Sequence, residues 1–68
     1  MTGRVVSFDA PRGLGVIEGD DGARYGFHCT EVADGSRAVP VGARVVYALA
    51  PGVLGSWEAA GISVTSSG

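Results

Sequence analysis

The sequence predicts an all-β domain in which five short antiparallel strands close into a small barrel. No helical period persists for ten residues anywhere along the 68-residue chain. Short runs rich in β-branched and aromatic residues alternate instead with turns rich in Gly, Asp and Pro. Closure into a barrel is favoured over a flat sheet because it removes the exposed strand edges that promote aggregation.

The N-terminal half contains the first three expected strands. Arg4 to Phe8 forms the first, and it ends at Asp9-Ala10-Pro11 because proline cannot donate to a ladder. The second strand runs from Gly15 to Glu18. Gly19-Asp20-Asp21-Gly22 then forms a hairpin turn, since Asp and Gly tolerate positive φ. Tyr25 to His28 is the third strand, antiparallel to the second.

Within the third strand, a period of two places Tyr25 and Phe27 on one face and Gly26 and His28 on the other. We expect the two aromatic rings, together with Tyr47, to point into the core. His28 then remains as the outward ring of this strand, where we expect it to contact a base or phosphate.

The C-terminal half supplies the last two strands. Thr30 to Ala33 begins with a capping residue and allows a single 3₁₀ turn, which Asp34-Gly35-Ser36 ends. Val39 to Gly42 is an extended connection to a fourth strand. That strand covers Arg44 to Leu49, with Val45 and Tyr47 on one face.

A loop containing Pro51, Gly52 and Gly55 leads to the fifth strand. This strand covers Trp57 to Val64, with Gly61 as a bulge, and residues 65–68 form a polar tail.

Length and charge restrict the class of protein. The chain, residues 1–68, has the size of a single small domain, near the limit at which one core offsets the entropy lost on folding. It has five arginines, seven acidic residues and a formal net charge of −2. No overall basic field attracts phosphates, so any nucleic-acid binding depends on local arginine placement.

The single cysteine, Cys29, excludes an internal disulfide and agrees with a reducing compartment. We expect it to be a half-buried apolar residue. His28 beside one thiol does not make a metal site, and we expect no metal or cofactor. No apolar run reaches the ~20 residues that cross a bilayer, and the N-terminus lacks a signal-peptide pattern. These features predict a cytoplasmic protein without membrane contact.

Three segments, Gly3–Asp9, Arg12–Ile17 and Tyr25–Cys29, carry a likeness by which the span from Gly3 to Val64 resembles the cold-shock domain family. Family members begin Gly-Lys-Val-Lys-Trp-Phe-Asn, which corresponds to Gly3-Arg4-Val5-Val6-Ser7-Phe8-Asp9. Their motif Lys-Gly-Tyr/Phe-Gly-Phe-Ile corresponds to Arg12-Gly13-Leu14-Gly15-Val16-Ile17, and Val-Phe-Val-His-Phe to Tyr25-Gly26-Phe27-His28-Cys29. The family's strand Gln-Ala-Ala-Asn-Val resembles Glu58-Ala59-Ala60-Gly61-Ile62, and Gly42 matches its Gly before strand four.

The resemblance implies an OB-fold barrel that binds single-stranded RNA or DNA on one sheet face. The binding residues that it implies are two cations, one ring, two aliphatic residues and one imidazole, namely Arg4, Phe8, Arg12, Leu14, Val16 and His28. Most of the family's stacking rings are replaced. Since each base stacked on an aromatic ring contributes ~1–3 kcal/mol, we expect binding of reduced or altered affinity.

Two residues keep alternative interpretations. Phe8 either contacts a ligand or is half-buried packing. Trp57 follows the loop that borders the ligand face of OB folds, where it either replaces a stacking ring or packs at the barrel end, and packing is the expectation. No catalytic residues are predicted, because Asp20, Asp21 and Asp34 are turn formers and Ser7 has no identifiable partner.

Two functions follow. In the first, the barrel binds single-stranded nucleic acid weakly. In the second, the barrel has lost that activity and uses the aliphatic face of Leu14, Val16 and Cys29 for contact with a protein partner or for homodimerisation. The response to salt discriminates between them, because phosphate binding releases counterions and an apolar contact does not.

Overall fold

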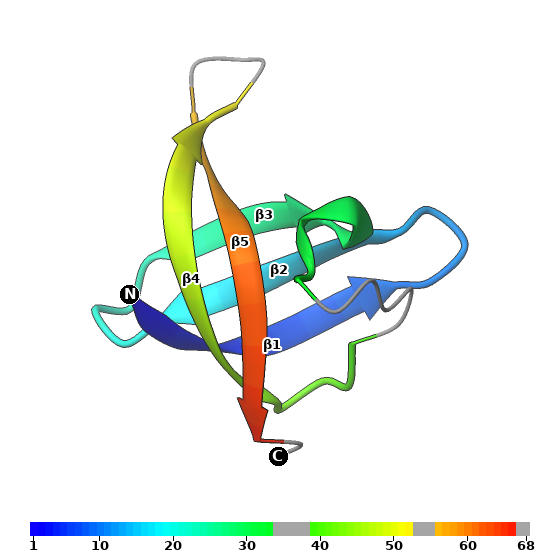
Figure 1. The fold of residues 1–68 in the computed structure, drawn as a ribbon, viewed down its shortest axis with the longest axis horizontal. Helices are drawn as coiled ribbons and strands as arrows, with labels where there is room; N and C mark the ends of the chain where they lie inside the picture. Colours follow the sequence, from blue (N-terminus) through cyan, green and yellow to red (C-terminus); the bar gives the residue numbers. More distant parts are fainter. Residues whose placement is uncertain (34–38, 53–55, 67–68) are drawn as a thin grey trace.

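The computed structural model describes residues 1–33, 39–52 and 56–66. The strands are β1 (Thr2–Asp9), β2 (Leu14–Gly19), β3 (Arg24–His28), β4 (Arg44–Pro51) and β5 (Trp57–Ser66), with one 3₁₀ turn, η1 (Cys29–Glu31). They close into a barrel in the order β1-β2-β3-β5-β4 (Figure 1). The predicted all-β, five-stranded barrel is confirmed, with the refinement that β3 pairs with β5 in parallel while the other pairs are antiparallel.

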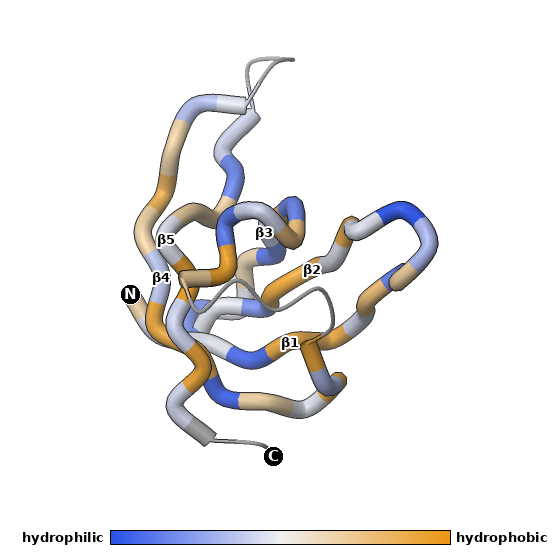
Figure 2. Tube along the Cα trace, turned by 45° about the vertical axis from the view of Figure 1, so that its right-hand side comes forward, coloured by the Kyte–Doolittle hydropathy of each residue, from blue (hydrophilic) through white to orange (hydrophobic). Residues whose placement is uncertain are grey.

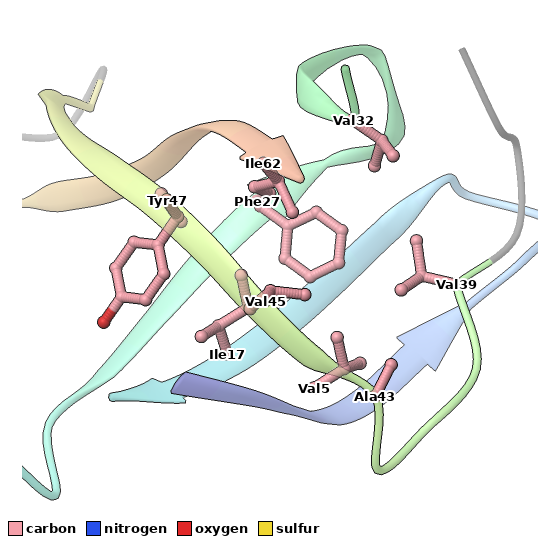
Figure 3. Close-up of a cluster of buried hydrophobic side chains, with 10 residues drawn as sticks. Val5, Ile17, Phe27, Val32, Val39, Ala43, Val45, Tyr47 and Ile62 are labelled. Atoms are coloured by element: carbon pink, nitrogen blue, oxygen red, sulfur yellow. The ribbon is translucent and has the colours of Figure 1, made fainter. Parts of the chain in front are cut away.

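The barrel interior holds one apolar core, to which every strand and η1's end contribute (Figure 3). Val5, Ile17, Val45 and Ile62 have the largest side chains that are fully buried. The strand alternation expected from the sequence is confirmed, since Phe27 is buried, Tyr25 packs against the core, and the neighbouring positions on β3 face outward. Figure 2 shows strongly hydrophilic residues in the turn between β1 and β2, away from this core.

Tyr47 lies at the side of the core with its hydroxyl pointing away from Phe27 (Figure 3). That hydroxyl is buried and has no hydrogen-bond partner among the described residues. Burial raises the pKa of Tyr47 above its ordinary value of 10.0, because the charged form would lose its hydration. The predicted core position of this ring is confirmed, and its ring also packs near that of Tyr25.

The predicted hairpin turn between β2 and β3 is present. The Gly22 amide donates to the Gly19 carbonyl at 2.9 Å, and β2 pairs with β3 from Leu14–His28 to Glu18–Arg24. The predicted 3₁₀ turn also forms, but its capping residue lies two positions earlier than expected. Its cap is His28 rather than Thr30, because the imidazole accepts a hydrogen bond from the Thr30 amide.

β5 differs most from its predicted limits. It continues to Ser66, so Thr65 and Ser66 belong to a strand rather than to a polar tail, and the Thr65 hydroxyl donates to the Arg44 carbonyl at 3.1 Å. The predicted bulge at Gly61 is confirmed by φ of 57° and by a register shift of β5 against β4. β4 includes Pro51, which was expected in the following loop.

Some expectations fall outside the described residues, namely the stop signal at residues 34–36, Gly55 in the loop and the last two residues of the tail. Within the described parts of the chain, no helix has the length and apolar character that a membrane span needs.

Candidate functional site

The strand register brings four residues into one row on the outer face of the barrel. Ser7 of β1 pairs with Val16 of β2, Val16 pairs with Gly26 of β3, and Gly26 pairs with Glu58 of β5. Directly paired residues of neighbouring strands present their side chains on the same face. The row therefore joins the N-terminal three strands to the start of β5.

A hollow of about 420 Å³ lies along this row, within the roughly 300–1,000 Å³ typical of small-ligand sites. Seven residues line it, and they come from β2, β3 and β5: Leu14, Gly15, Val16, Gly26, Phe27, His28 and Glu58. Gly26 explains the depression, because an outward position without a side chain lies between Val16 and Glu58. We call this feature the β2–β3–β5 hollow.

A second row borders the hollow at the C-terminal end of β3. Asp9 pairs with Leu14, and Leu14 pairs with His28. Leu14 is 44 % exposed, which is high for a leucine flanked by two paired strands. The hollow thus has an aliphatic side and an imidazole at its edge.

The hydrogen bonds of His28 determine which of its ring nitrogens is free. Nδ1 accepts from the Thr30 amide at 3.2 Å and lies 3.0 Å from the Thr30 hydroxyl. Since the amide can only donate, the neutral ring has its proton on Nε2. Among the described residues Nε2 has no hydrogen-bond partner, so His28 has an N–H donor available to a ligand.

Two of the arginines near this face take part in ion pairs. Arg12 lies 3.6 Å from Asp9, and Arg24 lies 3.3 Å from Glu18. Arg4 is exposed and pairs in the β1–β2 register with Glu18, and no ion pair is recorded for it within residues 1–33, 39–52 and 56–66. Exposed ion pairs contribute only about 0–1 kcal/mol to stability. A paired arginine can therefore leave its carboxylate and bind a phosphate at a small cost in free energy.

The structure places four of the six predicted site residues on the expected outer face. Leu14, Val16 and His28 line the hollow, and Arg4 stands in the row beyond Val16. Arg12 lies in the turn after β1, beside Asp9 at the other end of the face.

Phe8 is the sixth predicted residue, and its packing interpretation is the one that the structure supports. It is partly buried against the core, and its ring stacks on that of Phe27 with centroids 6.0 Å apart. It is absent from the lining of the hollow. Phe8 supports the floor of the site rather than presenting a surface to a ligand.

The expected packing of Trp57 is wrong. Its side chain is 59 % exposed, at the end of the β4–β5 pair that projects away from the other strands (Figure 1). Trp57 pairs with Pro51 there, and neither residue belongs to the buried core cluster or to the described side chains that pack against it. Because successive residues of a strand face opposite sides, Trp57 points away from the side of Glu58 and is not part of the hollow.

Cys29 is half-buried, as expected, and it is not among the residues that line the hollow. A Cβ on Gly13 would lie 2.7 Å from its sulfur, so the thiol packs against the turn between β1 and β2. The described residues contain no group of three or more His, Cys, Asp or Glu side chains that could hold a metal ion.

Sequence reasoning missed the roles of Gly26 and Glu58. Glu58 was matched to a family glutamine but was not assigned to the site. The signal that could have found it is the β3–β5 pairing of OB barrels, which brings Glu58 next to Gly26. That neighbour relation is invisible in local sequence, because 31 residues separate the two positions.

Together these observations define a small closed barrel of five strands with a half-open, largely apolar hollow on its outer face. No protein-family model matches the chain, and no curated protein matches its sequence.

Proposed function

We propose that this chain binds single-stranded nucleic acid, RNA or DNA, at low affinity in the β2–β3–β5 hollow. The observation that supports this most is the convergence of Leu14, Val16 and His28 on that one hollow. Aliphatic side chains and glycine backbone offer a flat apolar surface to one base, and the imidazole offers a hydrogen-bond donor. The proposal includes no catalytic role.

Low affinity follows from the composition of the face. Leu14, Val16 and Gly26 stand where the cold-shock family has stacking rings, each of which contributes ~1–3 kcal/mol per base. Glu58 adds a negative charge at the wall of the hollow. The nearby arginines are too few to compensate, because the whole chain has a net charge of −2.

Membership of the cold-shock domain family and a cytoplasmic location belong to the same proposal. The motif frame supports the first, since Arg12 to Ile17 covers the end of the turn and the first four residues of β2, of which Leu14 and Val16 lie on the outer side, where the family's binding residues are expected. The unpaired Cys29 supports the second, because free thiols are typical of reducing compartments.

A titration of a labelled oligo-pyrimidine strand, followed by fluorescence anisotropy, tests the proposal. We expect saturable binding with a micromolar Kd at about 20 mM salt. If the protein makes about two phosphate contacts, raising the salt to about 150 mM is expected to weaken binding roughly tenfold, because binding releases counterions. Absence of binding at about 100 μM strand would contradict the proposal.

The exposure of Leu14 favours a second candidate, in which the same aliphatic face binds a protein partner or a second copy of the chain. The double substitution Leu14→Tyr with Val16→Phe separates the two functions, because both side chains line the hollow. It adds two rings and strengthens nucleic-acid binding under the first function. Under the second, it disturbs the contact surface, and complex formation changes little with salt.

A further inference from the structure

We propose that the β2–β3–β5 hollow selects guanine, and that Glu58 is the residue that determines this specificity. The inference rests on the proposed function, namely that the hollow receives a base of a single strand. It specifies the preferred base and the protein atoms that recognise that base.

The position of Glu58 is the first argument. Glu58 pairs with Gly26, so the neighbouring position on β3 has no side chain. A Cβ on Gly52 would lie 2.9 Å from both Cγ and Cδ of Glu58, so Gly52, the residue after β4, lies against the carboxyl carbon of Glu58 and the methylene group next to it. No ion pair is recorded for its carboxylate within the described residues. Glu58 therefore lines an apolar hollow, and its carboxylate has acceptor capacity for a ligand.

The chemistry of a carboxylate gives the second argument. An ionised carboxylate only accepts hydrogen bonds, and it is matched best by two adjacent donors that bind both oxygens. Guanine is the base whose Watson–Crick edge presents two such adjacent donors, N1–H and the N2 amino group. Uracil presents one N–H between two carbonyl oxygens, which the carboxylate repels.

His28 provides the complementary group. Its Nε2–H is a donor, because Nδ1 already accepts from the Thr30 amide. Guanine has acceptors, O6 and N7, next to its donor edge, so one base can satisfy both the carboxylate and the imidazole. Leu14 and Val16 of β2 then contact the flat, apolar face of the base. Cytosine and adenine each offer a single amino group, and so they form one bond where guanine forms two.

The test compares single-stranded RNAs of about seven nucleotides by anisotropy at about 20 mM salt. One strand is all uridine, and three others have a central G, A or C. A fifth has a central inosine, which lacks the N2 amino group and is otherwise guanine. We expect the G strand to bind about tenfold more tightly than the U strand, and inosine to lose most of that preference.

The variant Glu58→Gln removes the two-acceptor edge and is expected to bring the G-to-U affinity ratio close to one. Glu18→Gln is the matched control, because it removes the same charge from the same face but outside the hollow. It is expected to raise the affinities for all strands together by freeing Arg24, and to leave the ratio unchanged.

Equal affinities for all five strands would overturn the guanine inference and leave the proposed function standing. The same holds if the G preference survives in Glu58→Gln or disappears equally in Glu18→Gln. Absence of binding to every strand at about 100 μM would overturn the proposed function itself, and the inference with it.

Discussion

At the scale of single residues, Gly15 both lines the hollow and contacts the aromatic rings of the core. It pairs with Phe8 on β1 and with Phe27 on β3, and the two rings stack next to it. A Cβ on Gly15 would lie 2.4 Å from the Phe27 ring and 3.0 Å from the Phe8 ring. The close approach of these rings therefore requires glycine, and it places the floor of the hollow directly over the core.

We predict that Gly15→Ala destabilises the protein by about 1–3 kcal/mol, because the added methyl group displaces an aromatic ring in a packed core. Gly26→Ala is the matched control on the neighbouring strand. Its Cβ would meet nothing closer than the Gly15 carbonyl at 3.9 Å, so its stability is expected to change by less than about 0.5 kcal/mol.

Urea unfolding followed by Trp57 fluorescence or circular dichroism measures both variants. Equal stabilities of Gly15→Ala and Gly26→Ala would show that the rings do not pack on Gly15 as described.

At the scale of elements, one exposed polar cluster ties the start of β1 to the β2–β3 turn and to β4. The Asp20 carboxylate accepts a hydrogen bond from the Thr2 hydroxyl and lies 3.2 Å from Nη1 of Arg44. Its pKa is lowered from the ordinary value of 3.8, first by the bond from Thr2 and then by Arg44. The cluster joins three segments that are distant in sequence on the outside of the barrel.

The lowered pKa predicts a pH-dependent contribution to stability. Folding favours the ionised form of Asp20, so the contribution is present above the unfolded-state pKa, near 3.8, and is lost as pH falls through the lowered folded-state pKa. The difference in unfolding free energy between wild type and Asp20→Asn is therefore expected to be larger at about pH 7 than at about pH 2.

Urea midpoints at the two pH values measure this difference, and Asp21→Asn is the control. Asp21 lies in the same turn and accepts from the Ala23 amide, without contacting Thr2 or Arg44. A wild-type to Asp20→Asn difference that is the same at both pH values would contradict the account.

Local sequence predicts elements best where the signal is short-range. The Gly19–Gly22 turn and the Gly61 bulge follow from glycine and aspartate chemistry within a few residues, and both are confirmed. The limits of β5 were wrong because its extension to Ser66 depends on pairing with Arg44. Trp57 was expected to pack because large rings usually do, but the β4–β5 pair extends past the core at that point.

At the scale of the whole molecule, the barrel was predictable and the hollow was not. Alternating strands and glycine-rich turns give the fold class, since they depend on composition and period alone. The hollow depends on closure, because only the parallel pairing of β3 with β5 places Glu58 beside Gly26. Three of the predicted site residues line it, because Leu14 and Val16 of β2 and His28 of β3 lie on neighbouring strands.

The central claim is that a single-stranded nucleic acid binds in the β2–β3–β5 hollow. The most direct test is a titration of the ¹⁵N-labelled protein with a short single strand, followed by amide chemical shifts. We predict saturable shifts that are largest at Leu14, Val16, Gly26, His28 and Glu58. Val46 and Val64 serve as references, because they are exposed apolar residues on β4 and β5 that do not line the hollow. Absence of shifts at about 100 μM strand, or shifts centred on those reference residues, would contradict the account.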